Sequence, residues 1–215
     1  MMYLQDMKYI LPALLVLVCG ASCGGGSPKL ISAPDTSTGS QGKSSPKKPS
    51  LGLDSVKALA ENGNARAQYK LGITYQYGNG VPMDLAIAVK WYRKAAEQGF
   101  RTAQYNFATM YSTGEGMPKN NEEAFKWFRM AAEQGHASSQ VAVGKMYENG
   151  ESVTKDIVAA HAWYGVAASA YGYPDGKKEM SRVAKGMSRE QLAKAKNLTK
   201  ELRKQIKQNT EKSDK

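Results

Sequence analysis

The chain repeats itself every 36 residues, and this repetition limits its possible folds more than any other feature. Its three tryptophans, Trp91, Trp127 and Trp163, lie 36 residues apart, and KWYRKAAEQG at 90–99 returns as KWFRMAAEQG at 126–135. Three units, 60–95, 96–131 and 132–167, therefore tile the middle of the chain. The same spacing relates Gly63, Gly99 and Gly135; Gln68, Gln104 and Gln140; Tyr75, Tyr111 and Tyr147; and Gly78, Gly114 and Gly150.

Each unit predicts a pair of helices. Apolar and small residues recur at helical spacing in two stripes, which in the first unit are residues 67, 71, 72, 75 and residues 88, 91, 92, 95. Glycine-containing loops separate the stripes, and Asp84, Asn120 and Asp156 stand where the second helix needs an N-cap. One helix pair cannot bury both stripes, so successive pairs must stack. The predicted fold class is all-α, an α-α superhelical solenoid of three repeats at 53–170.

These units resemble the Sel1-like repeat, a relative of the tetratricopeptide repeat. The resemblance covers residues 53–202 and rests on ARAQYKLGITYQYGNGVPMDLAIAVKWYRKAAEQG and TAQYNFATMYSTGEGMPKNNEEAFKWFRMAAEQG. The third unit, SSQVAVGKMYENGESVTKDIVAAHAWYGVAA, departs at Ser152 and Thr154, which replace a loop glycine and proline. The resemblance implies a non-catalytic adaptor that binds a protein or peptide in the concave groove of the solenoid.

Both ends of the solenoid require capping helices. Residues 53–60 predict a lone second helix that starts at Asp54, and residues 171–186 resemble a degenerate first helix. Ser188 and Gln191 form a capping box that opens a last helix. Its apolar stripe is Leu192, Ala195, Leu198, Leu202 and Ile206, with basic residues around it. We expect capping helices over 171–208 and a disordered tail over 209–215.

The first 52 residues predict export. Tyr9–Val18 is an apolar run inside a signal peptide over 1–22, too short to span a bilayer permanently. Small residues then lead to Cys23, which resembles the lipid-bearing cysteine of bacterial lipoproteins. Gly20 departs from that pattern, because an apolar residue such as Leu usually stands there. Cleavage near Ser22 without lipid is the alternative. Residues 23–52 are a flexible Gly/Ser/Pro/Lys linker. We expect a periplasmic protein anchored at Cys23, in the outer rather than the inner membrane because Gly24 follows the cysteine.

Composition argues against several functions. The net charge is +11, but residues 58–170 hold eleven basic and ten acidic side chains, so the repeat body offers no basic surface for nucleic acid. His136 and His161 are the only histidines, and both are expected in packing or surface roles. No metal cluster, cofactor motif or nucleophile motif appears, so no metal, cofactor or small-molecule substrate is expected, and a hydrolase is the weakest alternative.

Positions that differ between units are free to serve a ligand. On the first helix of each unit they follow steps of three, four and three, which places them on one helix face. We name this set the variable stripe: Arg66, Tyr69, Ile73 and Gln76; Thr102, Tyr105, Thr109 and Ser112; Ser138, Val141, Lys145 and Glu148. We predict partner binding by Arg66, Tyr69, Ile73, Gln76, Tyr105, Thr109 and Lys145. Two alternatives stay open: the stripe is merely exposed and variable, or the protein binds anionic lipid or glycan through its basic C-terminal helix.

Overall fold

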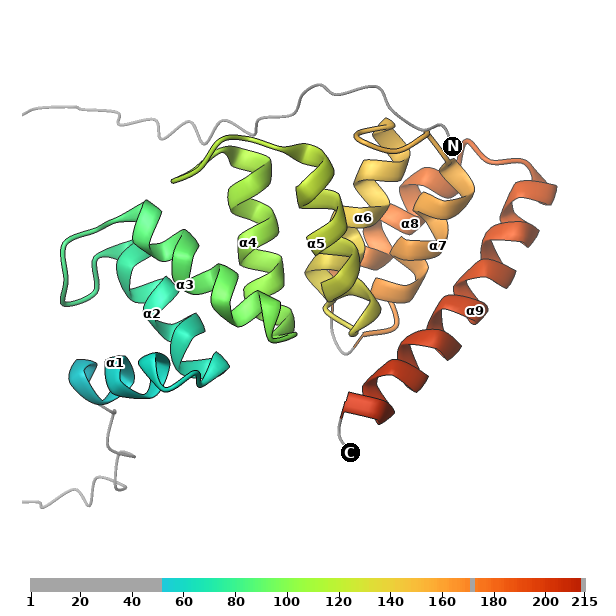
Figure 1. Ribbon diagram of the computed structural model, residues 1–215. Helices are drawn as coiled ribbons and strands as arrows, with labels where there is room; N and C mark the ends of the chain where they lie inside the picture. Colours follow the sequence, from blue (N-terminus) through green and yellow to red (C-terminus); the bar gives the residue numbers. More distant parts are fainter. Residues whose placement is uncertain (1–51, 171–172, 214–215) are drawn as a thin grey trace, which may run out of the picture. The chain divides into compact units, whose positions relative to one another are not determined.

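The computed structural model describes residues 52–170 and 173–213, which form helices joined by short turns (Figure 1). The first eight helices pack against each other in chain order, as stacked helix pairs require, and the ninth packs against the seventh. Within these residues there are nine helices and no strand, so the predicted all-α solenoid is confirmed. The helices are α1 (Leu53–Glu61), α2 (Ala65–Tyr77), α3 (Leu85–Glu97), α4 (Arg101–Thr113), α5 (Asn121–Glu133), α6 (Ala137–Asn149), α7 (Ile157–Ala167), α8 (Pro174–Ala184) and α9 (Arg189–Ser213).

The predicted caps define the repeated helix boundaries. The Asp84 carboxylate accepts a hydrogen bond from the Ile87 amide at 2.9 Å, and Asn120 accepts one from the Glu123 amide at 3.1 Å. Asp156 caps α7 in the same way, through the amides of Val158 and Ala159. Each first helix ends at a glycine with positive φ, between 67° and 80°. Local capping therefore gives each unit its two helices of nearly constant length.

The terminal helices differ in detail from the sequence prediction. Helix α1 has Gly52, not Asp54, as its N-cap, so Asp54 lies inside the first turn near the positive end of the helix dipole. Helix α8 begins only at Pro174, whose fixed φ suits a first turn. The predicted capping box of α9 is confirmed, because Ser188 and Gln191 exchange hydrogen bonds of 2.8 and 3.1 Å.

Helix α9 continues beyond residue 208, so the predicted tail from 209 is helical as far as Ser213. Three contacts explain the extension. Asn209 donates from its amide to the Glu133 carbonyl at 3.4 Å, Thr210 donates to the Ile206 carbonyl at 3.1 Å, and Lys207 pairs with Glu211 four residues on. The first of these contacts attaches the end of α9 to the end of α5.

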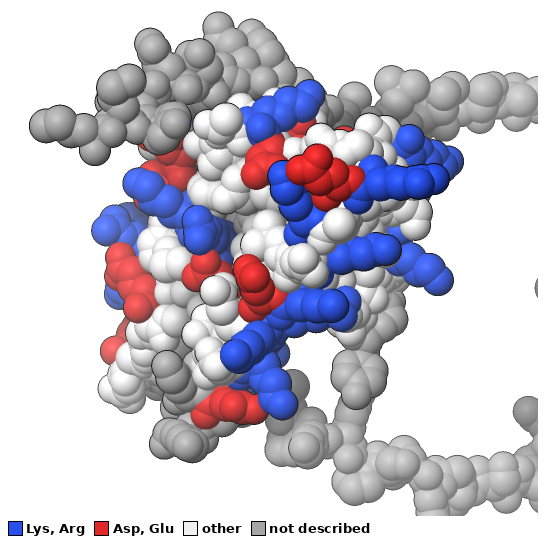
Figure 2. Space-filling view, turned by 90° about the vertical axis from the view of Figure 1, so that its right-hand side faces the viewer, with Lys and Arg blue, Asp and Glu red and all other residues white. Residues whose placement is uncertain are grey.

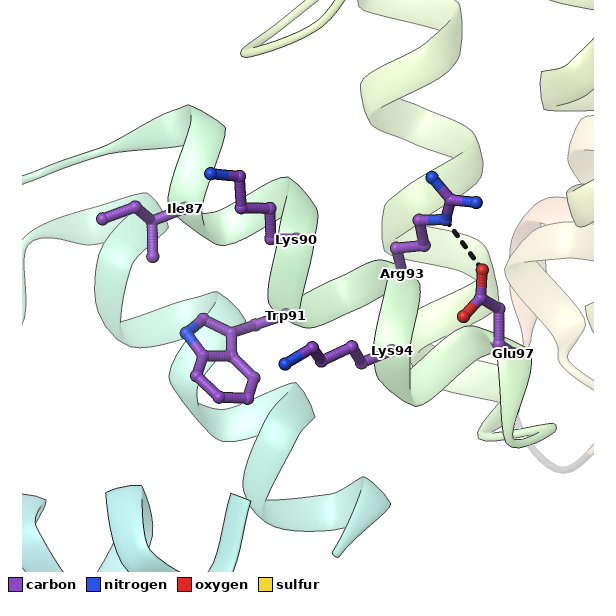
Figure 3. Close-up of a pocket in the computed structure, with 6 residues that line it drawn as sticks. All are labelled: Ile87, Lys90, Trp91, Arg93, Lys94 and Glu97. Atoms are coloured by element: carbon purple, nitrogen blue, oxygen red, sulfur yellow. Dashed lines mark hydrogen bonds and ion pairs between the residues drawn. The ribbon is translucent and has the colours of Figure 1, made fainter. Parts of the chain in front are cut away.

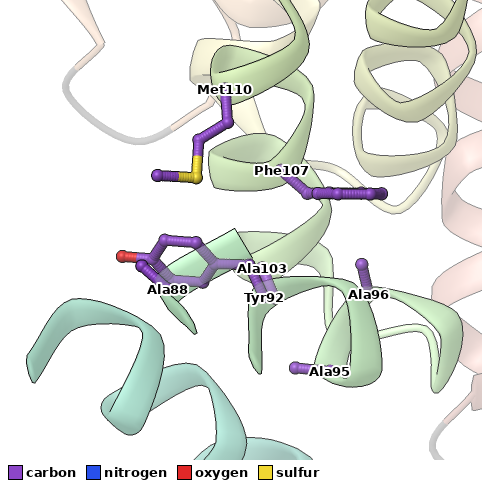
Figure 4. Packing of buried hydrophobic residues seen from close by; sticks show 7 residues of the cluster. All are labelled: Ala88, Tyr92, Ala95, Ala96, Ala103, Phe107 and Met110. Carbon is purple, nitrogen blue, oxygen red and sulfur yellow. The ribbon is translucent and has the colours of Figure 1, made fainter. Parts of the chain in front are cut away.

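Buried residues join each unit to the next. Alanines and Tyr92 of α3 pack against Ala103, Phe107 and Met110 of α4, and all of them are at most 1% exposed (Figure 4). Within a unit the helices approach closely, since a Cβ on Gly72 would lie only 2.4 Å from Cδ1 of Tyr92. Gly144 and Tyr164 repeat this arrangement in the third unit, at 2.6 Å.

The repeated glutamines connect each first helix to the helix that precedes it by hydrogen bonds. Gln68 donates to the Ala60 carbonyl at 3.1 Å, and Gln104 and Gln140 donate to the equivalent carbonyls of Ala96 and Ala132. Gln98 and Gln134 in turn donate to the first two of these glutamines at 2.6 and 2.7 Å. The 36-residue identity of the glutamine therefore has a structural cause, because each one satisfies a carbonyl at the end of the preceding helix.

Helix α7 differs from α3 and α5 because it is covered on its outer side as well. Lys90 and Lys126 correspond to Ala162, and Arg93 and Arg129 correspond to Gly165, so α7 presents no charge where the others are charged and exposed. Helix α9 packs across this face, with Ala195 fully buried. Arg203 donates to the Gly165 carbonyl at 2.8 Å. Trp163 is consequently only 4% exposed, whereas Trp91 and Trp127 are half-buried.

The described helices include none that is both long and apolar enough to cross a membrane. The predicted signal peptide, the linker up to residue 51 and Cys23 lie outside the described residues.

Candidate partner-binding site

The seven predicted site residues lie on the first helices of the units, α2, α4 and α6. Arg66 and Lys145 are exposed, and the other five are half-buried. None of the seven lines the cavity on α3, the cavity between α5 and the loop before α7, or the cavity between α7, α8 and α9. The stripe is therefore a helix surface with two exposed cations and a partly covered middle.

The two tyrosines of the stripe occupy equivalent places. The Tyr69 ring lies 5.9 Å from the Tyr92 ring and 5.2 Å from the Phe100 ring, measured between centroids. The Tyr105 ring lies 5.7 Å from Phe128 and 4.8 Å from the imidazole of His136. Burial raises the pKa of both phenols, although a side-chain hydrogen bond with Asn106 partly offsets the rise at Tyr69. Each tyrosine thus packs within its own unit and against the residue that precedes the next first helix.

Gln76 also makes a specific contact inside the molecule. Its side-chain oxygen accepts a hydrogen bond of 2.6 Å from the Tyr92 hydroxyl. In the third unit Glu148 accepts from the Tyr164 hydroxyl at 2.8 Å. The middle unit has Phe128 instead of tyrosine, and Ser112 at the stripe position bonds within its own helix. This position therefore carries a side-chain acceptor in the two units that have a tyrosine hydroxyl opposite it.

Glu148 joins the solenoid to α8. Arg182 donates to it at 2.6 Å and to Glu179 at 2.7 Å, and the Arg182 hydrogen bond is the main reason why the pKa of Glu148 is lowered. Another link to the capping helices runs from the Tyr173 hydroxyl to the Ser138 hydroxyl at 3.1 Å. Sequence reasoning missed both links, because spacing within the repeats contains no information about contacts with a non-repeating helix.

Two further stripe positions contribute to the structure itself. Thr109 donates its hydroxyl to the Tyr105 carbonyl one turn earlier, at 2.9 Å. Val141, at 7% exposed, belongs to a buried cluster with Tyr164 and Val183. The surface left for a partner comprises Arg66, Lys145, and the outer parts of Tyr69, Ile73 and Tyr105.

The two histidines are covered by the packed helices, His136 partly and His161 almost fully. His136 is the N-cap of α6, where its Nδ1 accepts from the Ser139 amide at 3.3 Å and lies 3.0 Å from the Ser139 hydroxyl. Burial, and to a smaller extent the charge of Arg101, lowers the pKa of His136 to about 4. His161 is 5% exposed on α7, and burial lowers its pKa too. In the described residues, no group of three or more His, Cys, Asp or Glu side chains could hold a metal ion.

A shallow cavity of about 400 Å³ lies on the outer face of α3 (Figure 3). The Lys94 amine stands 4.5 Å from the centre of the Trp91 ring, and Arg93 pairs with Glu97 at 2.7 Å. All its lining residues come from α3. Another cavity, of about 640 Å³, lies between α5 and the loop before α7. Tyr147 and Asp156 are among its lining residues.

The fold and the repeat length define the class of protein, a solenoid of 36-residue helix pairs. The model of the Sel1 repeat matches residues 65–100, 102–136 and 137–171. A crystal structure of a Sel1 repeat protein from Oxalobacter formigenes matches with a TM-score of 0.57 and 36% sequence identity, over 60% of this chain and 97% of that one. The chain therefore belongs to the Sel1 repeat family, whose members are generally non-catalytic scaffolds for protein–protein interaction.

A second solved structure supports the fold. It is c5321, a protective antigen present in uropathogenic Escherichia coli strains displaying an SLR fold, with 27% identity and a TM-score of 0.57. The match covers 74% of this chain but only 42% of that protein, so the chain spans less than half of its length. No curated protein matches the chain.

Proposed function

We propose that this protein is a non-catalytic adaptor of the bacterial cell envelope that binds a protein or peptide along the variable stripe. The observation that carries the proposal is that exposed Arg66 shares α2 with half-buried Tyr69, and that half-buried Tyr105 on α4 and exposed Lys145 on α6 continue the same stripe in the next two units. Arginine and tyrosine are the residues that most often dominate the affinity of protein interfaces. The charges would select an acidic partner, and the tyrosine rings would bury against it.

The direct test is photo-crosslinking in cells, with a photoreactive amino acid placed at position 66 or 145. Positions 119 and 185 are matched controls, because Lys119 and Lys185 are also exposed cations but lie outside the variable stripe. We expect one discrete product shared by positions 66 and 145 and absent from both controls. Equal products at the control positions, or none at 66 and 145, would overturn the proposal.

Reversing the two charges measures how much Arg66 and Lys145 contribute to the affinity for the partner. Arg66→Glu with Lys145→Glu should weaken capture of the crosslinked partner about tenfold, while Lys119→Glu with Lys185→Glu leaves it within twofold. These substitutions are preferable to Tyr69→Ala and Tyr105→Ala, because both tyrosines also pack within the solenoid. Undiminished capture by the stripe variant would contradict the assignment.

We further propose export through residues 1–22 and anchoring by lipid on Cys23, with residues 23–52 as the tether. The support is the order of apolar run, small residues, cysteine and flexible linker. A Cys23→Ala form should leave the membrane fraction and appear in the soluble periplasmic fraction. If it sediments with membranes as before, lipidation at Cys23 is the wrong account.

The basic surface of α9 favours a second candidate function, binding of anionic lipid or glycan. Figure 2 shows Lys and Arg side chains spread over the side of the molecule on which α9 lies in Figure 1. Lys200, Arg203 and Lys204 are all exposed there. Reversing these three charges should abolish such binding and its salt dependence, and should leave the adaptor function intact.

A further inference from the structure

The largest of the three cavities lies between α7, α8 and α9, and two of its lining residues, Lys200 and Arg203, also belong to the basic surface of the second candidate function. Its volume is about 720 Å³, within the range of pockets that enclose small organic ligands. Helix α7 contributes His161, helix α8 contributes Met180, and helix α9 contributes Leu192. The cavity arises because α9 crosses a face of α7 built from alanine and glycine, which leaves space beside the buried helix contact.

The lining combines an apolar interior with cations. Lys196, Lys200 and Arg203 line it from α9, and all three are exposed residues. No aspartate or glutamate is among the lining residues, and no described acidic side chain forms an ion pair with these three cations. By contrast, Lys194 and Lys207 of the same helix each pair with a glutamate. The uncompensated charge therefore lies at the cavity, and it would attract an anion.

His161 adds a polar group to the wall. The equivalent positions of the other units hold Val89 and Phe125, so packing alone does not require a histidine here. Its Nδ1 is buried and has no hydrogen-bond partner in the part of the chain that the structure describes. Buried polar atoms are nearly always paired, so the unpaired Nδ1 leaves at the wall a polar group whose hydrogen bond the described protein atoms do not supply.

We propose that this cavity binds a fatty acid, with the alkyl chain between Met180 and Leu192 and the carboxylate at Lys196 and Lys200. The apolar interior accounts for the chain, and the cations and His161 account for a carboxylate rather than a neutral or cationic head. This assignment deepens the second candidate function, because it names the ligand class and the place on α9, and it is independent of whether the variable stripe binds a partner.

Isothermal titration of the purified chain with dodecanoate tests the proposal. We expect saturable binding of one dodecanoate per chain. Dodecyltrimethylammonium, which has the same tail and a positive head, should not bind, and acetate, which has the head without the tail, should not bind either. Equal binding of the cationic amphiphile, or no saturable binding of dodecanoate, would overturn the proposal.

Matched variants locate the site. Lys196→Gln with Lys200→Gln should weaken dodecanoate binding about tenfold, because both cations line the cavity. Lys194→Gln with Lys204→Gln removes the same charge from the same helix outside the cavity, and affinity should change less than twofold. All four lysines are exposed, so the fold is retained. Equal weakening by both pairs would mean general attraction to the basic surface and would refute a site in the cavity.

Discussion

Gly144 lets the two helices of the third unit approach closely, because it carries a hydrogen atom where other residues carry Cβ. Replacing Gly144 by Ala would place Cβ 2.6 Å from Cε1 of Tyr164, whose ring is fully buried and cannot retreat. We expect Gly144→Ala to lower the free energy of unfolding by about 1–3 kcal/mol, the usual cost of overpacking. Chemical denaturation measures this. At an open helix position the same substitution stabilises by about 0.4–1 kcal/mol, so a gain in stability would contradict the packing described.

His136 makes the stability of the protein depend on pH. In the folded state its pKa lies at about 4, below the ordinary 6.5, so the unfolded chain binds the proton more readily. The stabilisation that neutral His136 adds to the folded state is therefore complete above pH 6.5 and is lost as the pH falls through 4. Protonation removes the lone pair of Nδ1 that accepts from the Ser139 amide.

The matched variant is His136→Asn, since Asn64 caps the equivalent helix of the first unit. Denaturation midpoints between pH 6.5 and 5 should fall less steeply for the variant than for the natural chain, with similar stability at pH 7.5. Identical slopes would show that His136 does not titrate as described. His161 is present in both proteins, so its own titration cancels in the comparison.

Residue identity in the variable stripe shows where sequence reasoning stops. The caps at Asp84, Asn120 and Asp156 were predictable, because a cap depends only on residues three positions away. The hydrogen bond between Gln76 and the Tyr92 hydroxyl was not, because it depends on how two helices lie side by side. A position can therefore differ between units and still have a structural partner.

At the scale of elements, α9 holds its place by burying small residues on α7. Ala195 is fully buried and Ala193 is exposed, so the two alanines form a matched pair on one helix. Ala195→Glu should place a charge against α7 and destabilise by about 3 kcal/mol or more, or detach α9. Ala193→Glu should change stability by no more than about 0.5 kcal/mol.

Tryptophan fluorescence reads out this detachment. In a background with Trp91→Phe and Trp127→Phe, emission comes from Trp163, which is 4% exposed beneath α9. Ala195→Glu should shift its emission to longer wavelength, whereas Ala193→Glu should not. If both variants leave the spectrum unchanged, α9 does not cover α7 in solution.

The sequence contains a signal for this covering that the repeat pattern hides. Residues 157–170 include no charged side chain, although the equivalent stretches of the first two units carry several. A helix that is apolar on all sides must be buried on all sides. That observation predicts that another segment covers α7. It does not predict the hydrogen bonds from α9 to the carbonyls of Ala162 and Gly165, because these depend on the three-dimensional path of the chain.

At the scale of the whole described solenoid, packing is uneven from one end to the other. Helix α1 packs chiefly against α2, whereas α7 packs against α6, α8 and α9. In α7 the nine residues from Ala159 to Ala167 are buried, but in α1 only Val56 and Ala60 are. In a stack of repeats each unit is stabilised mainly by its neighbours, so the two ends can open separately.

Native-state hydrogen exchange should resolve this difference. Amides of α1 and α2 should exchange through an opening of lower free energy than amides of α6 and α7, because the first unit has a shorter cap and fewer covering helices. Gly72→Ala, which places Cβ 2.4 Å from the Tyr92 ring, should accelerate exchange in α1–α3 and leave α7 unaffected. Gly144→Ala should accelerate exchange in α6 and α7. If each substitution accelerates exchange equally in all helices, the described residues unfold as one cooperative unit, and the stability of one end cannot be altered without altering the other.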